Sequence, residues 1–328
     1  MNTLLSFPFA SMGRRLRQAG VIGINARNSE YILQVNPRNR YQLVDNKLET
    51  KKLAAREGLA IPELFGVIRH NAETKDLASI IGSHQQFVVK PAAGAGGNGI
   101  LVFKERTGDL FRLASRRTMT LDDIAFHIRN ILAGSHSLSG QPDVALIESC
   151  VNFDPVFENI TYRGVPDIRI IAYKGVPAMA MLRLPTFESD GRSNLHQGAI
   201  GAGIDLATGR TLNAVYRNRI VDQHPDTLQP VAGLEIPHFA QMIETAARCN
   251  AMTGLGYVGA DIVIDRDRGP LLLELNARPG LAIQIANKAG LGARLRTIDE
   301  SRVHDLYEEE RIAFAKRTFA AGKQRQAA

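Results

Sequence analysis

The stretch QFVVKPAAGAGGNGILVF, from Gln86 to Phe103, places a glycine-rich loop between two runs of β-forming residues. Gly94, Gly96 and Gly99 spell GxGxxG, the spacing of a dinucleotide-binding loop that follows a strand and opens a helix. This loop does follow a strand, but residues 100–103 form a second β-type run. The stretch therefore predicts two strands joined by a glycine loop, and it argues against a Rossmann fold.

The same loop has two functional interpretations. The amides of Gly94, Gly96, Gly97 and Gly99 can fold over the phosphates of a nucleotide, as the glycine-rich loop of protein kinases does. Lys90, at the end of the incoming strand, would then point its ammonium group at those phosphates. The alternative is a hairpin loop that binds no ligand. The loop alone favours the ligand-free hairpin, and only neighbouring features could overturn that interpretation. The loop also lacks the GK[ST] of a Walker A site.

Hydrophobic periodicity on either side of the loop predicts alternating helices and strands, which is typical of an α/β fold. We expect residues 1–44 to be irregular, with weak helical spacing over 12–18, and Asp45 to cap the first clear helix. The predicted helices span residues 45–58, 76–81, 121–132 and 238–253. The predicted strands span residues 64–68, 86–90, 100–104, 144–148, 167–173, 176–184, 197–204, 257–264 and 271–276.

Three oxygen-bearing side chains are predicted to meet on one hairpin near the C-terminus. Glu274 and Asn276 lie two residues apart in LLLELN, so their side chains leave the same face of a strand. Asp261 lies on the preceding strand, which pairs with the first through a turn at residues 266–269. Carboxylate and amide oxygens suit Mg²⁺. The alternative is an exposed polar strand face with a structural aspartate.

The net charge of +7 over 328 residues invites a nucleic-acid function, but its distribution argues against one. Residues 1–44 hold six Arg and one Glu, and residues 310–328 hold five basic residues and one Glu. The 265 residues between these ends carry a net charge of −2. Aromatic residues that could stack on bases make up only 6% of the chain. We therefore do not expect nucleic acid to be a partner.

The cysteines and the hydropathy of the chain point to an ordinary cytoplasmic protein. Cys150 and Cys249 are far apart in sequence and belong to no metal-binding pattern, so we expect two buried free thiols. No stretch reaches the length of about 18 apolar residues that spans a membrane. Arginines next to apolar residues near the N-terminus predict a helix that docks on the rest of this protein, and a peripheral contact with a membrane, made directly or through a partner, is the alternative.

Four ordered motifs make the chain resemble the ATP-grasp superfamily. It is similar in particular to RimK-type, or alpha-L-glutamate ligase-like, proteins and to their sugar-transfer-associated branch. The resemblance covers roughly residues 45–290. Its motifs are Asp45-Asn-Lys-Leu48, Val88-Val-Lys-Pro91, Gly191-Arg-Ser-Asn-Leu-His-Gln-Gly198 and Leu273-Glu-Leu-Asn-Ala-Arg-Pro-Gly280. The chain departs from the pattern at Arg278, where a small residue is often found.

The resemblance implies roles for residues in each motif. Lys47 and Lys90 would contact ATP phosphates, and Glu148 would reach the adenine side. The residues expected to line the site or face the reacting groups are Asp167, Arg169, Arg183, Ser193, Asn194 and His196. Asp261, Glu274 and Asn276 would hold one or two Mg²⁺ ions, for which Mn²⁺ is an alternative.

The resemblance also implies an ATP-grasp fold in which two lobes clasp ATP, with a truncated N-terminal domain. We expect an Arg-rich arm over 1–44 in place of the usual preceding domain, and an N-lobe with the glycine loop over 45–150. A C-lobe with the metal site would span 151–295, and a basic helix and tail would span 296–328. The arm would contact a partner protein or a second copy of the chain.

The implied activity is an ATP- and Mg²⁺-dependent ligation of a carboxylate, for example glutamate, to an amine acceptor through an acyl phosphate. Two alternatives remain open at this point. An ATP-grasp phosphotransferase would use the same nucleotide site on a hydroxyl acceptor. A nucleotide-binding scaffold or regulatory protein would bind ATP without turnover.

Overall fold

The structure, a computed structural model, describes residues 8–94, 96–137 and 140–321. The chain forms two compact units. The first unit contains the described residues up to Tyr41, Val156–Ile262 and those from Asn276 onward, and the second contains Gln42–Pro155 and Val263–Leu275. Helices and two antiparallel sheets make up the described residues, which confirms the predicted α/β class.

The second unit is built on a six-stranded sheet with the order β1-β6-β2-β3-β4-β5. Its strands are β1 (Leu64–Ile68), β2 (Phe87–Pro91), β3 (Leu101–Thr107), β4 (Leu110–Leu113), β5 (Thr118–Met119) and β6 (Ala145–Glu148). Its helices are α4 (Gln42–Asp45), α5 (Lys47–Arg56), α6 (Leu77–Ile81) and α7 (Leu121–Leu132), with a 3-10 turn at Asn71–Asp76. β2 and β3 are antiparallel, as the sequence predicted for the strands on either side of the glycine loop.

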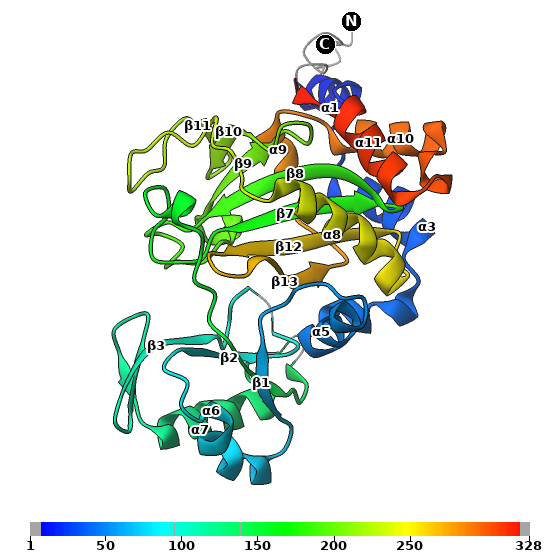
Figure 1. Ribbon diagram of the computed structural model, residues 1–328. Coiled ribbons are helices and arrows are strands. Elements are labelled where there is room, and N and C mark those ends of the chain that lie inside the picture. The colour runs from blue at the N-terminus through cyan, green and yellow to red at the C-terminus, as the bar shows by residue number, and fades with distance from the viewer. Residues whose placement is uncertain (1–7, 95, 138–139, 322–328) are drawn as a thin grey trace, which may run out of the picture. The chain divides into compact units, whose positions relative to one another are not determined.

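Helices α6 and α7 lie together against the sheet of the second unit (Figure 1). The core between them and the sheet contains three phenylalanines, Phe87, Phe103 and Phe111, whose rings contact one another. A smaller cluster of Leu48, Ala92 and Leu146 packs α5 against the sheet. These contacts place the start of α5 beside the glycine loop.

The first unit is built on a seven-stranded sheet with the order β11-β10-β9-β8-β7-β12-β13. The strands are β7 (Asp167–Tyr173), β8 (Val176–Leu184), β9 (Ile200–Ile204), β10 (Thr211–Tyr216), β11 (Arg219–Val221), β12 (Tyr257–Asp265) and β13 (Gly269–Asn276). β7 and β8 form the predicted hairpin, whose turn residues Lys174 and Gly175 both have positive φ. Part of β12 and most of β13 group with the second unit.

Helices pack on the sheet of the first unit. α8 (Phe239–Thr253) lies along β7 and β8, and α9 (Ile283–Asn287) packs on β8, β9 and β10 (Figure 1). A Cβ on Gly203 of β9 would lie only 2.6 Å from the carbonyl oxygen of Ala286, so α9 approaches the strand closely. After α9 follow α10 (Leu291–Ser301), a 3-10 turn at Val303–Asp305 and α11 (Glu308–Thr318). Residues 322–328 of the predicted tail lie outside the described residues.

The expectation of an irregular N-terminal arm is wrong, because its described residues are mostly helical. They form α1 (Pro8–Gln18), α2 (Ile24–Ala26), a π-helical turn at Arg27–Ile32, α3 (Leu33–Val35) and a 3-10 turn at Arg38–Arg40. Asn36 donates to the carbonyl of Tyr257 and accepts from its amide, each at 2.8 Å. Gln284 makes the same double contact with the backbone of Ile22, at 2.9 and 3.0 Å. The helical turns of the arm are thus tied to the first unit by contacts distant in sequence.

Two further expectations need correction. Asp45 ends α4 and does not cap the next helix; the cap of α5 is Asn46, whose side chain accepts from the amides of Leu48 and Glu49. The strand expected from residue 197 begins at Ile200, because residues 195–197 form a 3-10 turn. Strands β4, β5, β10 and β11 and helix α9 were not predicted. The expected basic helix within residues 296–328 corresponds to α11, and α10 was not predicted as a separate helix.

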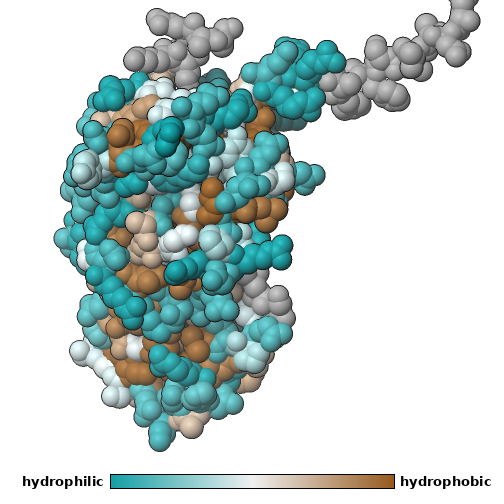
Figure 2. Space-filling view, turned by 90° about the vertical axis from the view of Figure 1, so that its right-hand side faces the viewer, coloured by the Kyte–Doolittle hydropathy of each residue, from teal (hydrophilic) through white to brown (hydrophobic). Residues whose placement is uncertain are grey.

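Both cysteines are buried free thiols, as predicted. Burial raises the pKa of Cys150, which belongs to the second unit, and raises the pKa of Cys249 in α8 of the first unit to about 12. Within the described residues, we find no helix with the length and apolar character needed to cross a membrane. On the face drawn in Figure 2, hydrophobic residues form separate small patches among hydrophilic ones.

We expect Phe103→Ala to lower the free energy of unfolding by about 3–5 kcal/mol, because it removes a large buried ring and leaves a cavity between Phe87 and Phe111. Phe126→Ala is the matched control, since Phe126 is 60% exposed on α7. Urea titrations of both variants measure the difference. A loss for Phe103→Ala as small as that for Phe126→Ala would contradict the packing described above.

Candidate active site

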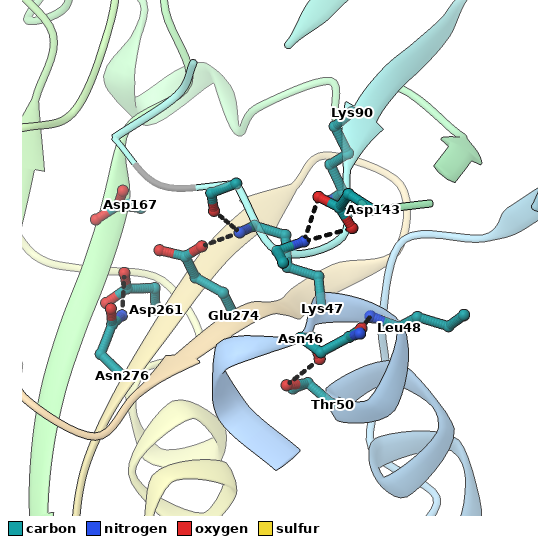
Figure 3. A network of polar contacts seen from close by, with 12 residues as sticks. Asn46, Lys47, Leu48, Thr50, Lys90, Asp143, Asp167, Asp261, Glu274 and Asn276 are labelled. Atoms are coloured by element: carbon teal, nitrogen blue, oxygen red, sulfur yellow. Dashed lines mark hydrogen bonds and ion pairs between the residues drawn. The ribbon is translucent and has the colours of Figure 1, made fainter. Parts of the chain in front are cut away.

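The glycine loop of the second unit is held at its start by backbone and carboxylate contacts. The amide of Lys47 donates to the carbonyl of Ala92 at 2.8 Å, which ties the first residue of α5 to the loop. Asp143 accepts from the amide of Ala93 with both carboxylate oxygens, at 2.9 and 3.1 Å (Figure 3). Further along, Gly96, Gly97 and Gly99 all have positive φ, a conformation that favours glycine. Ala95 lies outside the described residues.

The ammonium group of Lys47 lies beside this loop. Its Nζ donates to the carbonyl of Gly94 at 2.6 Å and lies 3.3 Å from Oε2 of Glu274 (Figure 3). The side chain of Lys47 is 13% exposed, and that of Glu274 is 34% exposed. Lys47 is therefore partly buried and held by oxygen acceptors, the kind of partner that a phosphate also provides.

A buried carboxylate, Glu148 at the end of β6, lies between two lysines. Nζ of Lys51, from α5, is 2.8 Å from Oε2, and Nζ of Lys90, from β2, forms an ion pair with Oε1. All three residues are at most 5% exposed. Lys51 also donates to the carbonyl of Pro62 at 3.1 Å. Two ammonium groups for one carboxylate leave an excess of one positive charge when all three groups are ionised.

The protonation states in this cluster follow from burial and charge. Burial lowers the pKa of Lys51 to about 8, although Glu148 opposes the shift and Lys90 adds to it. Burial alone would raise the pKa of Glu148, but the charges of Lys90 and Lys51 outweigh it and hold the pKa below its usual value. Glu148 is therefore ionised at neutral pH, and the lowered pKa of Lys51 lies only slightly above neutral pH.

A second charged cluster lies on adjacent strands of the first unit. Asp261 on β12 is directly opposite Arg169 on β7, and Asp167 on β7 is directly opposite Arg183 on β8. Arg169 donates to both oxygens of Asp261, at 2.6 and 2.7 Å. Nη2 of Arg183 donates to Asp167 and to Asp261, each at 2.8 Å, and its Nε also donates to Asp167. The pairing of the strands thus builds a row of two arginines and two aspartates.

The carboxyl of Asp167 in this row responds strongly to burial. Burial raises its pKa to about 7, with a further rise from the charge of Asp261 and opposing effects from Arg183 and Arg169. Near neutral pH the carboxyl of Asp167 is therefore protonated in a substantial fraction of molecules. When Asp167 is protonated, the row of two arginines and two aspartates carries one excess positive charge.

Two of the three predicted metal ligands contact each other directly. Nδ2 of Asn276 donates to Oδ2 of Asp261 at 3.0 Å. Glu274 is two residues before Asn276 on β13 and forms an ion pair with Lys47. Among the described residues, no three His, Cys, Asp or Glu side chains form a cluster that could hold a metal ion. The predicted set has two carboxylates and one amide oxygen, and hard oxygen donors of this kind fit Mg²⁺.

The predicted loop residues Ser193, Asn194 and His196 make local contacts. Ser193 donates to the carbonyl of Val165 at 2.8 Å. The side chain of Asn194 accepts from the amide of His196 at 3.0 Å and starts the 3-10 turn at Leu195–Gln197. His196 is exposed. These contacts fix the shape of the loop and leave the His196 ring at the surface.

The structure adds two residues that the sequence did not single out, Lys51 and Asp143. Lys51 lies four residues after Lys47 on α5, a spacing that puts two side chains on one face of a helix, so this signal was available. Asp143 lies two residues before β6, and no local pattern marks it. Its contact with Ala93 depends on residues 50 positions apart in sequence.

Comparison with known proteins is decisive for the family. The model of the family described as sugar-transfer associated ATP-grasp matches residues 26–300. The chain belongs to this ATP-grasp family. The match spans the glycine loop and both charged clusters, and it confirms the resemblance drawn from the four motifs.

Individual relatives of this ATP-grasp chain are distant. A probable alpha-L-glutamate ligase from Sodalis glossinidius (strain morsitans) is 23% identical over 261 residues, which cover 79% of this chain and 66% of that protein. The ATP-grasp ligase PsnB, solved with a minimal precursor, has 16% identity and a TM-score of 0.44, covering 82% of this chain and 64% of its own. The match thus spans just under two thirds of the length of both relatives.

Two further solved structures are similar to the ATP-grasp chain, again with low sequence identity. The D-cycloserine synthetase DcsG has 16% identity and a TM-score of 0.42, covering 80% of this chain and 73% of its own. The D-alanine–D-alanine ligase from Bacillus anthracis, complexed with ATP, has 12% identity and a TM-score of 0.42, covering 88% and 70%.

We expect Glu148→Gln to lower the free energy of unfolding by about 3–5 kcal/mol at neutral pH, because it leaves two buried ammonium groups without their counter-charge. Glu49→Gln is the control: Glu49 pairs with Lys52 on the exposed side of α5, so its loss should cost less than about 1 kcal/mol. Urea unfolding measures both. Equal effects would show that the buried cluster does not stabilise the second unit.

We expect Asp167→Asn to change how stability depends on pH. The folded protein keeps a proton on Asp167 that the unfolded chain loses above about pH 4, so this group makes stability fall as pH rises from about 4 to about 7. The variant lacks that contribution. The unfolding free energy of the wild type minus that of Asp167→Asn should therefore decrease between pH 5 and pH 8.

Urea midpoints at pH 5, 6, 7 and 8 in the presence of a chelator measure this difference. The exposed turn residue Asp109 provides the control variant Asp109→Asn, for which the difference from wild type should stay constant. A constant difference for Asp167→Asn as well would mean that Asp167 titrates in its ordinary range.

Proposed function

We propose that this ATP-grasp chain is a Mg²⁺- and ATP-dependent ligase that joins a carboxylate to an amine through an acyl phosphate. The observation that supports the proposal most strongly is the cluster around Glu148, where a family ATP site is expected and where buried lysines outnumber carboxylates beside the glycine loop. An excess of fixed positive charge in a low-dielectric place is what a triphosphate requires.

The proposal assigns a role in ATP binding to the lysines, the glycine loop and the glutamates of the second unit. Lys90, held by Glu148, and Lys47 donate to phosphate oxygens, and the amides of Gly96, Gly97 and Gly99 add further donors. The carbonyl of Gly94 and the carboxylate of Glu274 hold Lys47 in the protein alone, so phosphate oxygens would take over as its acceptors. Glu148 keeps its expected place near the adenine side as the anchor of Lys51 and Lys90.

Mg²⁺, held by Asp261, Glu274 and Asn276, would neutralise charge on the phosphates when bound, and Mn²⁺ would serve the same purpose. Arg169 and Arg183 orient Asp261 in the protein alone. Arg183 also binds Asp167, whose pKa lies near 7. A bound anion would therefore change the protonated fraction of Asp167, and with it the net charge of the row of two arginines and two aspartates.

The reaction then proceeds in two steps. A carboxylate oxygen attacks the γ-phosphorus of ATP, which breaks the bond to the bridging oxygen and releases ADP. The amine next attacks the carbonyl carbon of the acyl phosphate, loses a proton and releases inorganic phosphate. Arg169 and Arg183 stabilise the negative charge that develops, and Asn194 and His196 face the acyl group from the loop that follows β8.

Exclusion of water is the other requirement, because water would hydrolyse the acyl phosphate. We assign this task to the glycine loop and to the loop that carries Ser193. We further propose that residues 1–44 form an Arg-rich arm, residues 45–150 the N-lobe, residues 151–295 the C-lobe and residues 296–328 a basic helix and tail. Glutamate is our candidate carboxylate, and the arm is our candidate contact for a partner or a second copy.

The test is ATP turnover with Mg²⁺ against a panel of carboxylates and amines, with product masses read directly. We expect one pair to give an amide with release of free phosphate. Asp261→Asn and Glu274→Gln should each lower that turnover by about 100-fold or more, because each removes a charge that the transition state needs.

Glu63→Gln, at an exposed position ahead of β1, is the control and should turn over normally. Thermal unfolding of all variants separates loss of chemistry from loss of fold. ATP binding without turnover on any pair, or a phosphorylated product that persists, would overturn the ligase proposal.

A further inference from the structure

Lys51 of α5 has no direct role in the proposed reaction, although it is buried beside groups that we propose to bind ATP. Its side chain is only 3% exposed, and its Nζ lies 2.8 Å from Oε2 of Glu148. The same Nζ donates to the carbonyl of Pro62 at 3.1 Å. Lys90 forms an ion pair with the other carboxylate oxygen, Oε1. Glu148 thus has a counter-charge in Lys90, and its neutralisation does not require Lys51.

The burial of this second ammonium group is unfavourable. Burial disfavours the charged form of a lysine. The charged groups that act on Lys51 from neighbouring elements are one anion, Glu148, and two cations, Lys90 and Arg268. Arg268 lies in the turn between β12 and β13 and pairs with Asp265 at 2.8 Å, so it brings no negative charge to Lys51. The burial of Lys51 would be explained by a state of the protein in which Glu148 no longer has Lys90 as its partner.

Binding of a triphosphate would create that state. In the protein alone, the ammonium group of Lys90 is paired with Glu148. If this ammonium group shifts toward a phosphate oxygen, the buried carboxylate loses a counter-charge, which is costly unless a second cation lies beside it. Lys51 is such a cation, and it comes from a different element, α5. Its contact with the carbonyl of Pro62 helps to hold it beside Glu148.

We propose that Lys51 is a positioning residue that neutralises Glu148 when the ammonium group of Lys90 shifts from that carboxylate to a phosphate group of ATP. Lys51 acts through Glu148 and Lys90 and does not contact the nucleotide. The shift exchanges one oxygen acceptor of Lys90 for another, so it breaks no covalent bond and transfers no proton. The inference rests on the ATP binding in the proposed function, and it does not depend on which carboxylate and amine are joined.

The compensation requires the proton of Lys51. Burial lowers the pKa of Lys51 to about 8, with a further decrease from the charges of Lys90 and Arg268 and an opposing effect from Glu148. Below this pH Lys51 is charged and can replace Lys90 as the partner of Glu148. Above it Lys51 is neutral, so Lys90 remains paired with the carboxylate. The affinity for ATP should therefore fall as the pH rises through about 8.

The test is calorimetric titration of the full chain with ATP and Mg²⁺, without carboxylate or amine, from about pH 7.5 to about pH 9 at constant ionic strength. For the wild type, Kd should rise roughly five- to tenfold over this range, the change that one proton with a pKa of about 8 produces. Lys51→Met keeps an unbranched buried side chain without the charge. Its Kd should already be about tenfold higher than that of the wild type at the lowest pH, and it should stay constant. Lys51→Arg stays charged, so it should match the wild type at the lowest pH and then stay constant.

The control is Lys52→Met, which removes the same charge from the exposed side of α5, where Lys52 pairs with Glu49. It should follow the wild type at every pH, and thermal unfolding checks that each variant is folded. Wild-type affinity in Lys51→Met, or a fall with pH in either Lys51 variant as steep as in the wild type, would overturn the inference and leave the ligase proposal intact. Binding of ATP without turnover on any substrate pair would overturn the ligase proposal alone. Absence of ATP binding in the wild type would overturn both.

Discussion

Glu148 occupies a position where strand pairing, helix packing and charge all meet. It is opposite Leu64 of β1 on one side and opposite Val88 of β2 on the other, so its backbone is fixed within the sheet. Its carboxylate is fixed in turn by Lys51 and Lys90. A buried charge is tolerated only with its counter-charges in place. The side chains of Lys51 on α5 and Lys90 on β2 are therefore both oriented by this one carboxylate.

The two charged clusters differ in their balance of positive and negative charge. Around Glu148, positive charge exceeds negative charge, and the excess is held rigidly in a sheet and a helix. In the row of Asp167, Arg169, Arg183 and Asp261, the charges balance when both aspartates are ionised. The first arrangement fits the proposed role of this cluster in attracting phosphate. The second can gain or lose a proton at Asp167, so it adapts to a change of charge nearby.

Much of the fold was predictable where local signals agree with tertiary packing. The β7–β8 hairpin was predicted with its observed bounds, because apolar runs are joined by Lys174-Gly175, residues that accept the positive φ of a tight turn. α7 was predicted with its observed bounds from its hydrophobic periodicity, and the structure shows a capping box of Thr120 and Asp123 at its start. The helical arm was missed because its stability comes from distant partners, such as the contact of Asn36 with Tyr257. The resemblance named every charged side chain of the two clusters except Lys51, whereas the contact of Asp143 with Ala93 depends on tertiary structure that no local pattern records.

The two buried thiols have a practical consequence. Thiolate is the form that reacts with alkylating reagents, and burial keeps Cys150 and Cys249 both shielded and protonated. Each compact unit contains one of them. Each unit thus contains one cysteine that reacts only when the unit opens. Mass spectrometry after a brief pulse of alkylating reagent would measure the rate of opening of each unit separately, without any engineered label.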